Sequence, residues 1–460
     1  MNLDDLKDKK VAILGLGIEG LALASFLDGK VKNITLLDRA SEEELIKKSE
    51  ENIELKKVLD RGYHKVFGEK YLDYLGDYKY IFRSPGVKVL EPKIQDANLN
   101  GVVVSSQIKL FFDLCPAKII GVTGTKGKGT TSSLIESMMK EDGFKVHLAG
   151  NIGEPAITLL DKIESSDWVI LELSSFQLQD LKISPHIAVI TNIAVDHLDY
   201  HKDEEEYILA KESISKYQKS DDIIIANKDN ENAVKISNIS NGKKLFFSGK
   251  EECDGFVKGD KVFVRIDDNY IEICSASEIQ LVGKHNLENI TSAALASIAA
   301  GAQIDSIKKG AKNFQGLSHR LELAGKKNGK KFFNDSFATN PEPTIAAINS
   351  FDEPITIILG GSSKGADFSK LASEIVKSSV NNVILIGDEA DKIEKALIEE
   401  NYSKSIVKME GDMQDFVNKA DEVSKSGDVI LLSPACASFG LFNNYKERGY
   451  KFIEAVKNLN

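Results

Sequence analysis

Short apolar runs alternate along this chain with longer stretches whose apolar residues recur at helical spacing. Near the start, apolar runs at residues 10–14 and 33–37 flank an apolar helical stretch at 21–27. This order predicts a strand, a helix and a second strand. A glycine-rich turn follows the first run, and Asp38 follows the second; the turn reads Gly15-Leu16-Gly17-Ile18-Glu19-Gly20. Together these features predict a Rossmann-like β-α-β unit.

The strand and helix pattern starts again after Pro116. A second series of apolar runs, separated by helical patterns, predicts a doubly wound sheet; the runs lie at 118–122, 168–171, 187–190 and 222–225. Residues 243–274 instead alternate apolar and polar positions between Asp-Gly and Asp-Asp-Asn turns. That alternation predicts a small antiparallel region.

A third series of apolar runs follows Gly316, at residues 331–333, 355–359, 383–386 and 429–432. We therefore predict an α/β protein of three domains. A Rossmann-like domain spans 1–113, a central P-loop ATPase-type domain with a parallel sheet and a small antiparallel region spans 114–315, and a C-terminal Rossmann-like domain spans 316–460.

Composition excludes several classes of partner. The 460 residues carry a formal net charge of -11, which argues against a nucleic-acid partner held by phosphate contacts. The first residues are charged and no apolar run reaches the roughly 20 residues of a spanning helix, so we expect a cytoplasmic protein without a membrane segment. The four cysteines lack Cys-x-x-Cys spacing, which indicates neither a zinc site nor a disulfide framework.

The strongest local signal is a second glycine-rich turn between the run at 118–122 and a helix. Backbone N–H groups of such a turn approach phosphate oxygens closely, and Lys128 can reach the terminal phosphates. The turn departs from the usual P-loop, because Val122 stands where a glycine is usual and Gly129 stands where a hydroxyl usually follows the lysine. Thr130 is therefore our candidate magnesium ligand. The predicted ATP loop comprises Gly124, Thr125, Lys126, Gly127, Lys128, Gly129, Thr130 and Thr131.

This loop resembles that of the Mur ligases and of the folylpolyglutamate synthases, and its lysine-glycine-threonine order favours the folate branch. Motifs downstream resemble instead the Mur ligases that add D-glutamate. They are Leu171-Glu172-Leu173-Ser174-Ser175-Phe176-Gln177-Leu178, Asn286 and Asn289 after His285, Gly316-Leu317-Ser318-His319-Arg320-Leu321-Glu322, Asn334-Asp335-Ser336, and Ser433-Pro434-Ala435-Cys436-Ala437-Ser438.

The resemblance implies a catalytic centre with two magnesium ions. Its metal ligands would be Thr130, Glu172, His197 and Lys211, the lysine as a carbamate, and Lys128, Glu172, His197 and Lys211 would be the catalytic set. His197 also follows a predicted buried strand, at the sheet edge where doubly wound folds bind ligands. Taken alone, His197 could equally be a capping or core histidine, and Lys211 a surface lysine paired with Glu212.

For ATP, the resemblance adds Asn286 and Asn289 at the adenine, with helix capping as the alternative role, and Arg320 and Asp335 at the phosphates or ribose. For the UDP substrate it implies Gly17, Ile18, Asp38, Ser84 and Gly86 at the uridine diphosphate, with Asn151 and Ser174 at the sugar-peptide end. An NAD-dependent dehydrogenase would also explain the first glycine turn. It would explain neither the second phosphate loop nor the third domain.

For the incoming amino acid, the resemblance implies Thr339, Lys364, Ser438, Phe439 and Tyr445. The implied partners are UDP-N-acetylmuramoyl-L-alanine, D-glutamate and ATP. We expect the protein to act as a monomer in peptidoglycan precursor synthesis. Phe337 stands where the family usually carries a lysine. A folylpolyglutamate synthase-like ligase, or a UDP-sugar-peptide ligase with another acceptor such as L-glutamate, therefore remains an alternative.

Overall fold

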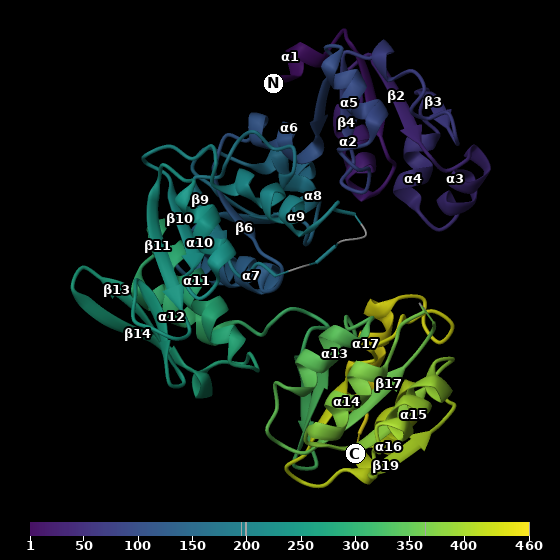
Figure 1. Cartoon of the computed structure of the whole chain (residues 1–460), viewed down its shortest axis with the longest axis vertical. Coiled ribbons are helices and arrows are strands. Elements are labelled where there is room, and N and C mark those ends of the chain that lie inside the picture. Colours follow the sequence, from purple (N-terminus) through teal and green to yellow (C-terminus); the bar gives the residue numbers. More distant parts are fainter. Residues whose placement is uncertain (195, 198–199, 364, 460) are drawn as a thin grey trace. The chain divides into compact units, whose positions relative to one another are not determined.

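The structure is a computed structural model that describes residues 1–194, 196–197, 200–363 and 365–459. Its strands form three separate sheets, each flanked by helices, which confirms the predicted three-domain α/β fold (Figure 1). The first two sheets belong to one compact unit, Met1–Cys274 with Glu288–Ala311; the third belongs to another, Ser275–Leu287 with Lys312–Asn460. The exact domain boundaries stay predictions. Within the described residues, no helix combines the length and apolar character needed to cross a membrane.

The first sheet is parallel throughout and has the strand order β3-β2-β1-β4-β5. Its strands are β1 Lys10–Leu14, β2 Asn33–Asp38, β3 His64–Phe67, β4 Tyr80–Arg83 and β5 Val103–Ser106. Its helices are α1 Leu3–Leu6, α2 Ile18–Leu27, α3 Glu42–Ser49, α4 Ile53–Leu59, η1 Leu75–Asp77, α5 Pro92–Leu99 and α6 Gln107–Leu114. The central strand β1 is buried from Val11 onwards because helices cover both faces of a parallel sheet.

The second sheet has nine strands in the order β14-β13-β12-β11-β10-β9-β6-β8-β7. The strands are β6 Lys118–Thr123, β7 Val146–Gly150, β8 Trp168–Glu172, β9 Ile187–Ile190, β10 Ile223–Asn227, β11 Lys243–Ser248, β12 Gly255–Lys258, β13 Lys261–Ile266 and β14 Asn269–Ser275. The helices are α7 Lys128–Glu141, η2 Ala156–Lys162, α8 Ser175–Leu178, α9 Glu204–Lys211, η3 Glu212–Ile214, α10 Glu231–Asn238, η4 Ala276–Glu278, α11 His285–Ala299 and α12 Ile304–Asn313.

The antiparallel part of this sheet is smaller than the sequence pattern predicts. Strand β11 pairs in parallel with both β10 and β12, and antiparallel pairing begins only between β12 and β13. Because α10 connects β10 to β11 as a crossover, β11 still belongs to the doubly wound part. The prediction of antiparallel pairing across residues 243–274 was therefore wrong for β11.

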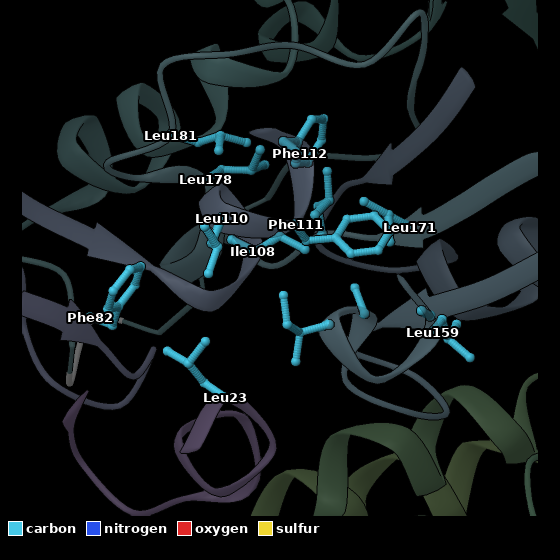
Figure 2. Packing of buried hydrophobic residues seen from close by; sticks show 14 of the residues in the cluster. Leu23, Phe82, Ile108, Leu110, Phe111, Phe112, Leu159, Leu171, Leu178 and Leu181 are labelled. Atoms are coloured by element: carbon cyan, nitrogen blue, oxygen red, sulfur yellow. The ribbon is translucent and has the colours of Figure 1, made fainter. Parts of the chain in front are cut away.

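A shared core joins the first two sheets through α6. The buried side chains of Ile108, Leu110, Phe111 and Phe112 belong to one apolar cluster with residues of both sheets. Figure 2 shows them among Leu23 and Phe82 of the first sheet layer and Leu159, Leu171, Leu178 and Leu181 of the second. Burial of apolar area on this scale is the main stabilising term in folding. The α6 helix therefore links the cores of the first two sheets.

The third sheet has the order β15-β16-β20-β17-β18-β19 and is parallel except for β15 against β16. Its strands are β15 Glu322–Lys327, β16 Lys330–Asn334, β17 Ile355–Gly360, β18 Val380–Ile386, β19 Ser405–Lys408 and β20 Val429–Leu432. Its helices are α13 Pro341–Ile348, α14 Ser369–Lys377, α15 Ala390–Glu399, α16 Met413–Val423 and α17 Tyr445–Lys457. Separate apolar cores fill the two faces of this sheet.

The glycines of the first turn have different structural roles. Gly20, in the first turn of α2, lies so close to the preceding loop that a Cβ there would be 2.0 Å from the carbonyl oxygen of Gly15. At Gly17, the residue before α2, a Cβ would meet no atom within 4 Å, and the φ of -75° suits any residue.

We expect Gly20→Ala to lower the free energy of unfolding by about 2 kcal/mol or more, because overpacking against backbone exceeds the roughly 1 kcal/mol helix-propensity gain of alanine. Gly17→Ala is the matched control and should change it by less than about 0.5 kcal/mol. Scanning calorimetry of the full chain would measure both. Equal transition temperatures for the two variants would contradict this division of roles.

Candidate active site

The phosphate loop after β6 is shaped by close backbone packing. Gly124 and Gly127 both have positive φ, 150° and 85°. A Cβ at Gly124 would lie 2.0 Å from Thr191 Oγ1, and one at Gly127 would lie 2.5 Å from Asn289 Oδ1. Larger residues are therefore excluded at both positions. The loop leads directly into α7, whose first N–H groups provide an anion-binding helix end.

The two threonines after Lys128 differ in their surroundings. Thr131 is fully buried, and its hydroxyl donates to Asn289 Oδ1 at 3.4 Å. Thr130 keeps part of its surface exposed. Thr131 therefore holds α7 against α11, whereas Thr130 remains accessible to a ligand. Asn289 itself contacts the loop and α7, and Asn286 donates to the carbonyl of Val282 at 2.7 Å.

Two lysines converge on one carbonyl oxygen of this loop. Lys128 Nζ donates to the carbonyl oxygens of Gly124 and Thr125, each at 3.0 Å. Lys211 Nζ, at the end of α9, donates to the same Gly124 oxygen at 3.2 Å and to Thr123 Oγ1 at 3.5 Å. The carboxyl edge of β6 therefore brings two lysine side chains together on one loop carbonyl.

Lys211 is a core residue. Its side chain is 1% exposed and lies over the ring of Tyr207, at 4.7 Å from the ring centroid. Glu212 pairs instead with Lys216 at 4.0 Å, so the alternative of a surface lysine paired with Glu212 is wrong. Burial, with the nearby charge of Lys128, lowers the pKa of Lys211 from 10.5 to about 7. A large fraction of this amine is therefore neutral at physiological pH.

Glu172 ends β8, the strand that pairs with β6, and Val122 is its partner in that register. Its carboxylate therefore reaches the same sheet edge as the phosphate loop. The side chain is buried, and Oε1 accepts a hydrogen bond from Asn151 Nδ2 at 2.9 Å. Asn151, predicted at the sugar-peptide end of the substrate, thus orients Glu172. Ser174, predicted there too, caps α8 through the N–H of Gln177.

His197 lies in the loop after β9 with a left-handed backbone, φ 54°, which is uncommon for a residue other than glycine. Its side chain is about half exposed, with Nε2 3.6 Å from Asp196 Oδ2 and its ring 5.0 Å from that of Phe176.

His201, which was not among the predicted site residues, is buried beside His197. Its Nε2 lies 2.9 Å from Ser175 Oγ and its ring stacks on Phe176. His201 therefore anchors this loop to α8.

A cavity of about 590 Å³ opens beside the first glycine turn. Its lining includes all five residues predicted for uridine diphosphate: Gly17, Ile18, Asp38, Ser84 and Gly86. Ile18 is 79% exposed and offers an apolar platform at the cavity wall. Asp38 accepts from the N–H groups of Leu16 and Ala40, at 2.7 and 2.8 Å, and so fixes the turn. Asn151 and Ser174 do not line this cavity.

Glu19 is a second functional candidate that the sequence analysis missed. It lines the same cavity, and its Oε1 accepts from Gln177 Nε2 at 2.6 Å. Oε2 is buried without a hydrogen-bond partner among the described residues. Burial raises the pKa of Glu19 from 4.5 to about 7, although the Gln177 hydrogen bond and the charge of Arg83 oppose the shift. A protonatable carboxyl thus lies at the wall of a predicted anion site.

In the second unit, Asp335 follows β16 and is buried. Ser433 Oγ donates to its Oδ2 at 2.7 Å and the N–H of Leu321 to its Oδ1 at 3.3 Å. Burial raises the pKa of Asp335 to about 7. Buried Arg448, another residue the sequence analysis missed, donates to Ser336 and to the carbonyls of Cys436 and Ala437. It thereby joins the two predicted binding loops of this unit.

Phe337 takes up the position of the missing lysine and supports a cation there. The guanidinium carbon of Arg320 lies 3.8 Å from the centroid of the Phe337 ring, a close cation–π contact. Tyr445 packs edge-on against the same ring, with centroids 5.1 Å apart. A positive charge, that of Arg320, therefore lies directly over the Phe337 ring.

A small cavity of about 150 Å³ lies close to the predicted amino-acid residues. It is lined by Thr339, Asn340, Ser362, Ala366, Phe368, Glu389, Ala435 and Cys436. Of the other predicted residues, Ser438 is buried, Phe439 is 60% exposed and Tyr445 begins α17. Lys364 lies outside the described residues.

Three family models match this chain in the order of its three sheets. The MurD-like N-terminal domain of Mur ligases matches residues 9–106, the Mur ligase middle domain 122–297, and the glutamate ligase domain of Mur ligases 319–436. The UDP-N-acetylmuramoylalanine--D-glutamate ligase of Clostridium tetani is 39% identical over 457 residues, which are 98% of this chain and 97% of that protein. The chain belongs to the Mur ligase family.

A second relative agrees with that assignment, and a solved structure shares the fold. The UDP-N-acetylmuramoylalanine--D-glutamate ligase of Acetivibrio thermocellus is 40% identical to this Mur ligase over 461 residues, covering 99% of this chain and 97% of that one. The crystal structure of UDP-N-acetylmuramate-alanine ligase MurC from Thermotoga maritima shares the fold, with a TM-score of 0.59 at 16% identity and coverage of 98% and 99%. As a Mur ligase, the protein is an ATP-dependent amide-bond-forming enzyme.

The described part of the Mur ligase contains no group of three ordinary metal ligands. Among the residues that the structure describes, no three histidine, cysteine or acidic side chains cluster closely enough to hold an ion. Glu172 is the one acidic member of the predicted metal set. A carbamate on Lys211 would add a second carboxylate at the same edge.

The low pKa of Lys211 also gives a prediction for stability. Between pH 7 and 10.5 the unfolded chain binds a proton at this lysine that the folded chain does not. Its contribution to stability therefore rises with pH across that window and is lowest below pH 7. In buffers free of magnesium and carbon dioxide, we expect Lys211→Met to raise the free energy of unfolding at pH 6 by about 2 kcal/mol or more.

The stability gain should shrink toward zero as the pH rises through 10.5, because above that pH the Lys211 amine is neutral in both the folded and the unfolded wild-type chain. Thermal unfolding across this pH range measures the difference in stability between wild type and Lys211→Met. Lys216 is an exposed lysine nearby, and Lys216→Met is the control. A stability difference that does not change with pH would show that Lys211 titrates normally.

Proposed function

We propose that this Mur ligase joins D-glutamate to UDP-N-acetylmuramoyl-L-alanine, a step of peptidoglycan precursor synthesis, using ATP and magnesium. The observation that carries the proposal is the identity of 39–40% over nearly the whole length of relatives that bear this activity in their names. The geometry supports it, because the chain holds two separate anion-binding turns. One follows β1 beside the 590 Å³ cavity and the other follows β6.

The cavity beside the first turn takes the uridine diphosphate. Gly17, Ile18 and Asp38 form its base-binding wall, and Ser84 and Gly86 face the diphosphate. Asn151, which donates to Glu172 at 2.9 Å, and Ser174, which caps α8, hold the sugar-peptide end of the substrate. The cytoplasm supplies both ATP and UDP-linked sugars, and we propose that the enzyme acts there as a monomer.

The loop from Gly124 to Thr131 holds the ATP phosphates. Lys128 and the N–H groups at the start of α7 stabilise charge on the γ-phosphate during transfer. Asn286 and Asn289 bind the adenine. Arg320 and Asp335, which follow α12 in the chain, contact the phosphates or the ribose. Thr130, Glu172, His197 and carbamylated Lys211 would hold magnesium ions, whose charge would offset that of the phosphate oxyanions.

The reaction proceeds in two halves. The free carboxylate of the UDP substrate attacks the γ-phosphorus of ATP, which gives an acyl phosphate and ADP. The amine of D-glutamate then adds to the acyl carbon, and the tetrahedral intermediate expels phosphate to leave the amide. Thr339, Lys364, Ser438, Phe439 and Tyr445 hold the amino acid, with the Arg320 and Phe337 pair close to Tyr445.

A substrate screen tests the reaction directly. ADP release should require UDP-N-acetylmuramoyl-L-alanine together with D-glutamate, and mass spectrometry should find the amide product. Dihydropteroate with L-glutamate tests for a folylpolyglutamate synthase-like ligase. The UDP substrate with L-glutamate tests for a ligase that adds the other acceptor. ADP release at least tenfold faster with either of these pairs would replace the proposed function.

Carbamylation of Lys211 follows from its buried, partly neutral amine. Carbon dioxide adds to the lone pair of a neutral amine and a proton is lost, which leaves a carbamate anion. We expect activity to fall severalfold when carbon dioxide is stripped from buffers near pH 6.5, and to return on adding bicarbonate. Lys211→Arg should stay inactive with bicarbonate, whereas Lys216→Arg should behave as wild type. Full activity in stripped buffer would remove the carbamate from the proposal.

A further inference from the structure

Arg83 is a fully buried cation outside the site described above. It ends β4, directly before the Ser84-Pro85-Gly86 loop, and its side chain is 1% exposed. A buried guanidinium is costly unless its N–H groups are hydrogen bonded and its charge is paired. The groups that Arg83 contacts therefore indicate the role of this side chain.

Part of the guanidinium contacts the loop that lines the 590 Å³ cavity. Nη1 donates to the carbonyl oxygen of Val87 at 2.6 Å, and lies 3.3 and 3.4 Å from those of Ser84 and Pro85. In a trans peptide the C=O and the following N–H point in opposite directions. Drawing the carbonyls of Pro85 and Val87 toward Arg83 therefore turns the next N–H groups away from it, which is the orientation a diphosphate needs.

The rest of the guanidinium contacts the second sheet layer. Nη2 donates to the carbonyl oxygen of Phe176 and to Asp180 Oδ2, both at 3.1 Å, and Nε to the same Asp180 oxygen at 3.3 Å. Tyr200 completes the contact, because its hydroxyl lies 3.3 Å from Nη1 and donates to the carbonyl of Val87 at 3.1 Å.

These partners adjoin the predicted metal residues in sequence and in space. Phe176 lies in α8, four residues after Glu172, and Tyr200 lies three residues after His197. The Phe176 ring contacts both Tyr200 and His197, with centroids 4.3 and 5.0 Å apart. One arginine thus touches the loop of the nucleotide cavity and the segments that carry Glu172 and His197.

We propose that Arg83 is a positioning residue that sets the orientation of the diphosphate loop and its distance from the segments bearing Glu172 and His197. This rests on the proposed function. The substrate is held by its diphosphate at one end and reacts at a carboxylate at the other, so both ends must be correctly placed at the same time. An error in the distance between the diphosphate loop and the segments bearing Glu172 and His197 lowers kcat even when each end binds normally.

Two variants separate the two halves of this role. Arg83→Met removes all the contacts with little change in volume, whereas Asp180→Asn weakens only the ion pair with the segment after α8 and leaves the loop carbonyls held. We expect Arg83→Met to weaken UDP binding, measured by calorimetry, at least fivefold and to lower kcat at least tenfold. Asp180→Asn should bind UDP within twofold of wild type and still lower kcat at least fivefold with the full substrate.

The KM for ATP should stay within twofold in both variants, since the phosphate loop has no contact with Arg83 in the described structure. Arg83→Lys keeps the charge without the fork of donors, so it should recover less than half of the lost kcat. Lys79→Met, on the surface just before β4, is the control for altered charge near this strand.

If Arg83 only stabilised the fold, both variants would melt earlier but keep wild-type kcat, KM and UDP affinity below their melting temperatures. That result would overturn the proposal. If Arg83→Met fails to fold, Asp180→Asn still decides, because unchanged kcat in that variant refutes the coupling. If wild type does not ligate the UDP substrate, the proposed function fails, while UDP affinity still tests the loop orientation.

Discussion

The carbonyl oxygen of Gly124 accepts hydrogen bonds from two lysines, and the catalytic edge of the central sheet is arranged around this shared contact. Lys128 enters from the loop itself and Lys211 from α9, at 3.0 and 3.2 Å. The repulsion between two ammonium groups is relieved by loss of a proton from the buried one, by modification of that amine, or by an anion. All three outcomes suit a phosphate-transferring enzyme. The close packing at Gly124 and Gly127 holds the loop so that the Gly124 carbonyl faces both lysines.

Buried arginines perform an analogous task in both units. Arg83 holds carbonyls of the loop after β4, and Arg448 holds carbonyls of Cys436 and Ala437 together with Ser336. A guanidinium has several donors in a rigid plane, so one side chain can fix several peptide units at once. Fixing carbonyls in this way also fixes the direction of the neighbouring N–H groups. Each arginine therefore orders a loop that is predicted to bind substrate.

The difference between binding loops and the residues that order them explains how far the sequence could predict the molecule. The strands and the turns after β1 and β6 have local signals, since a strand, a glycine turn and a helix are consecutive in the chain. The residues predicted at the 590 Å³ cavity came instead from the resemblance to the Mur ligases. Arg83, Arg448, Glu19 and His201 have none, because their roles depend on segments that meet only after folding. Asn151 illustrates the same limit. Its place after β7 was visible in the sequence, but its hydrogen bond to Glu172 depends on how β7 and β8 pair.

The carboxyl of Glu19 has a consequence for the energetics of ligand capture. Its pKa is about 7, and a diphosphate entering the same cavity would raise it further, because a neighbouring negative charge favours the neutral acid. Capture would then take a proton from solution near neutral pH. The heat released would include the ionisation heat of whichever buffer supplies that proton. Measured enthalpies would therefore differ between phosphate and Tris solutions, although the contacts formed are the same.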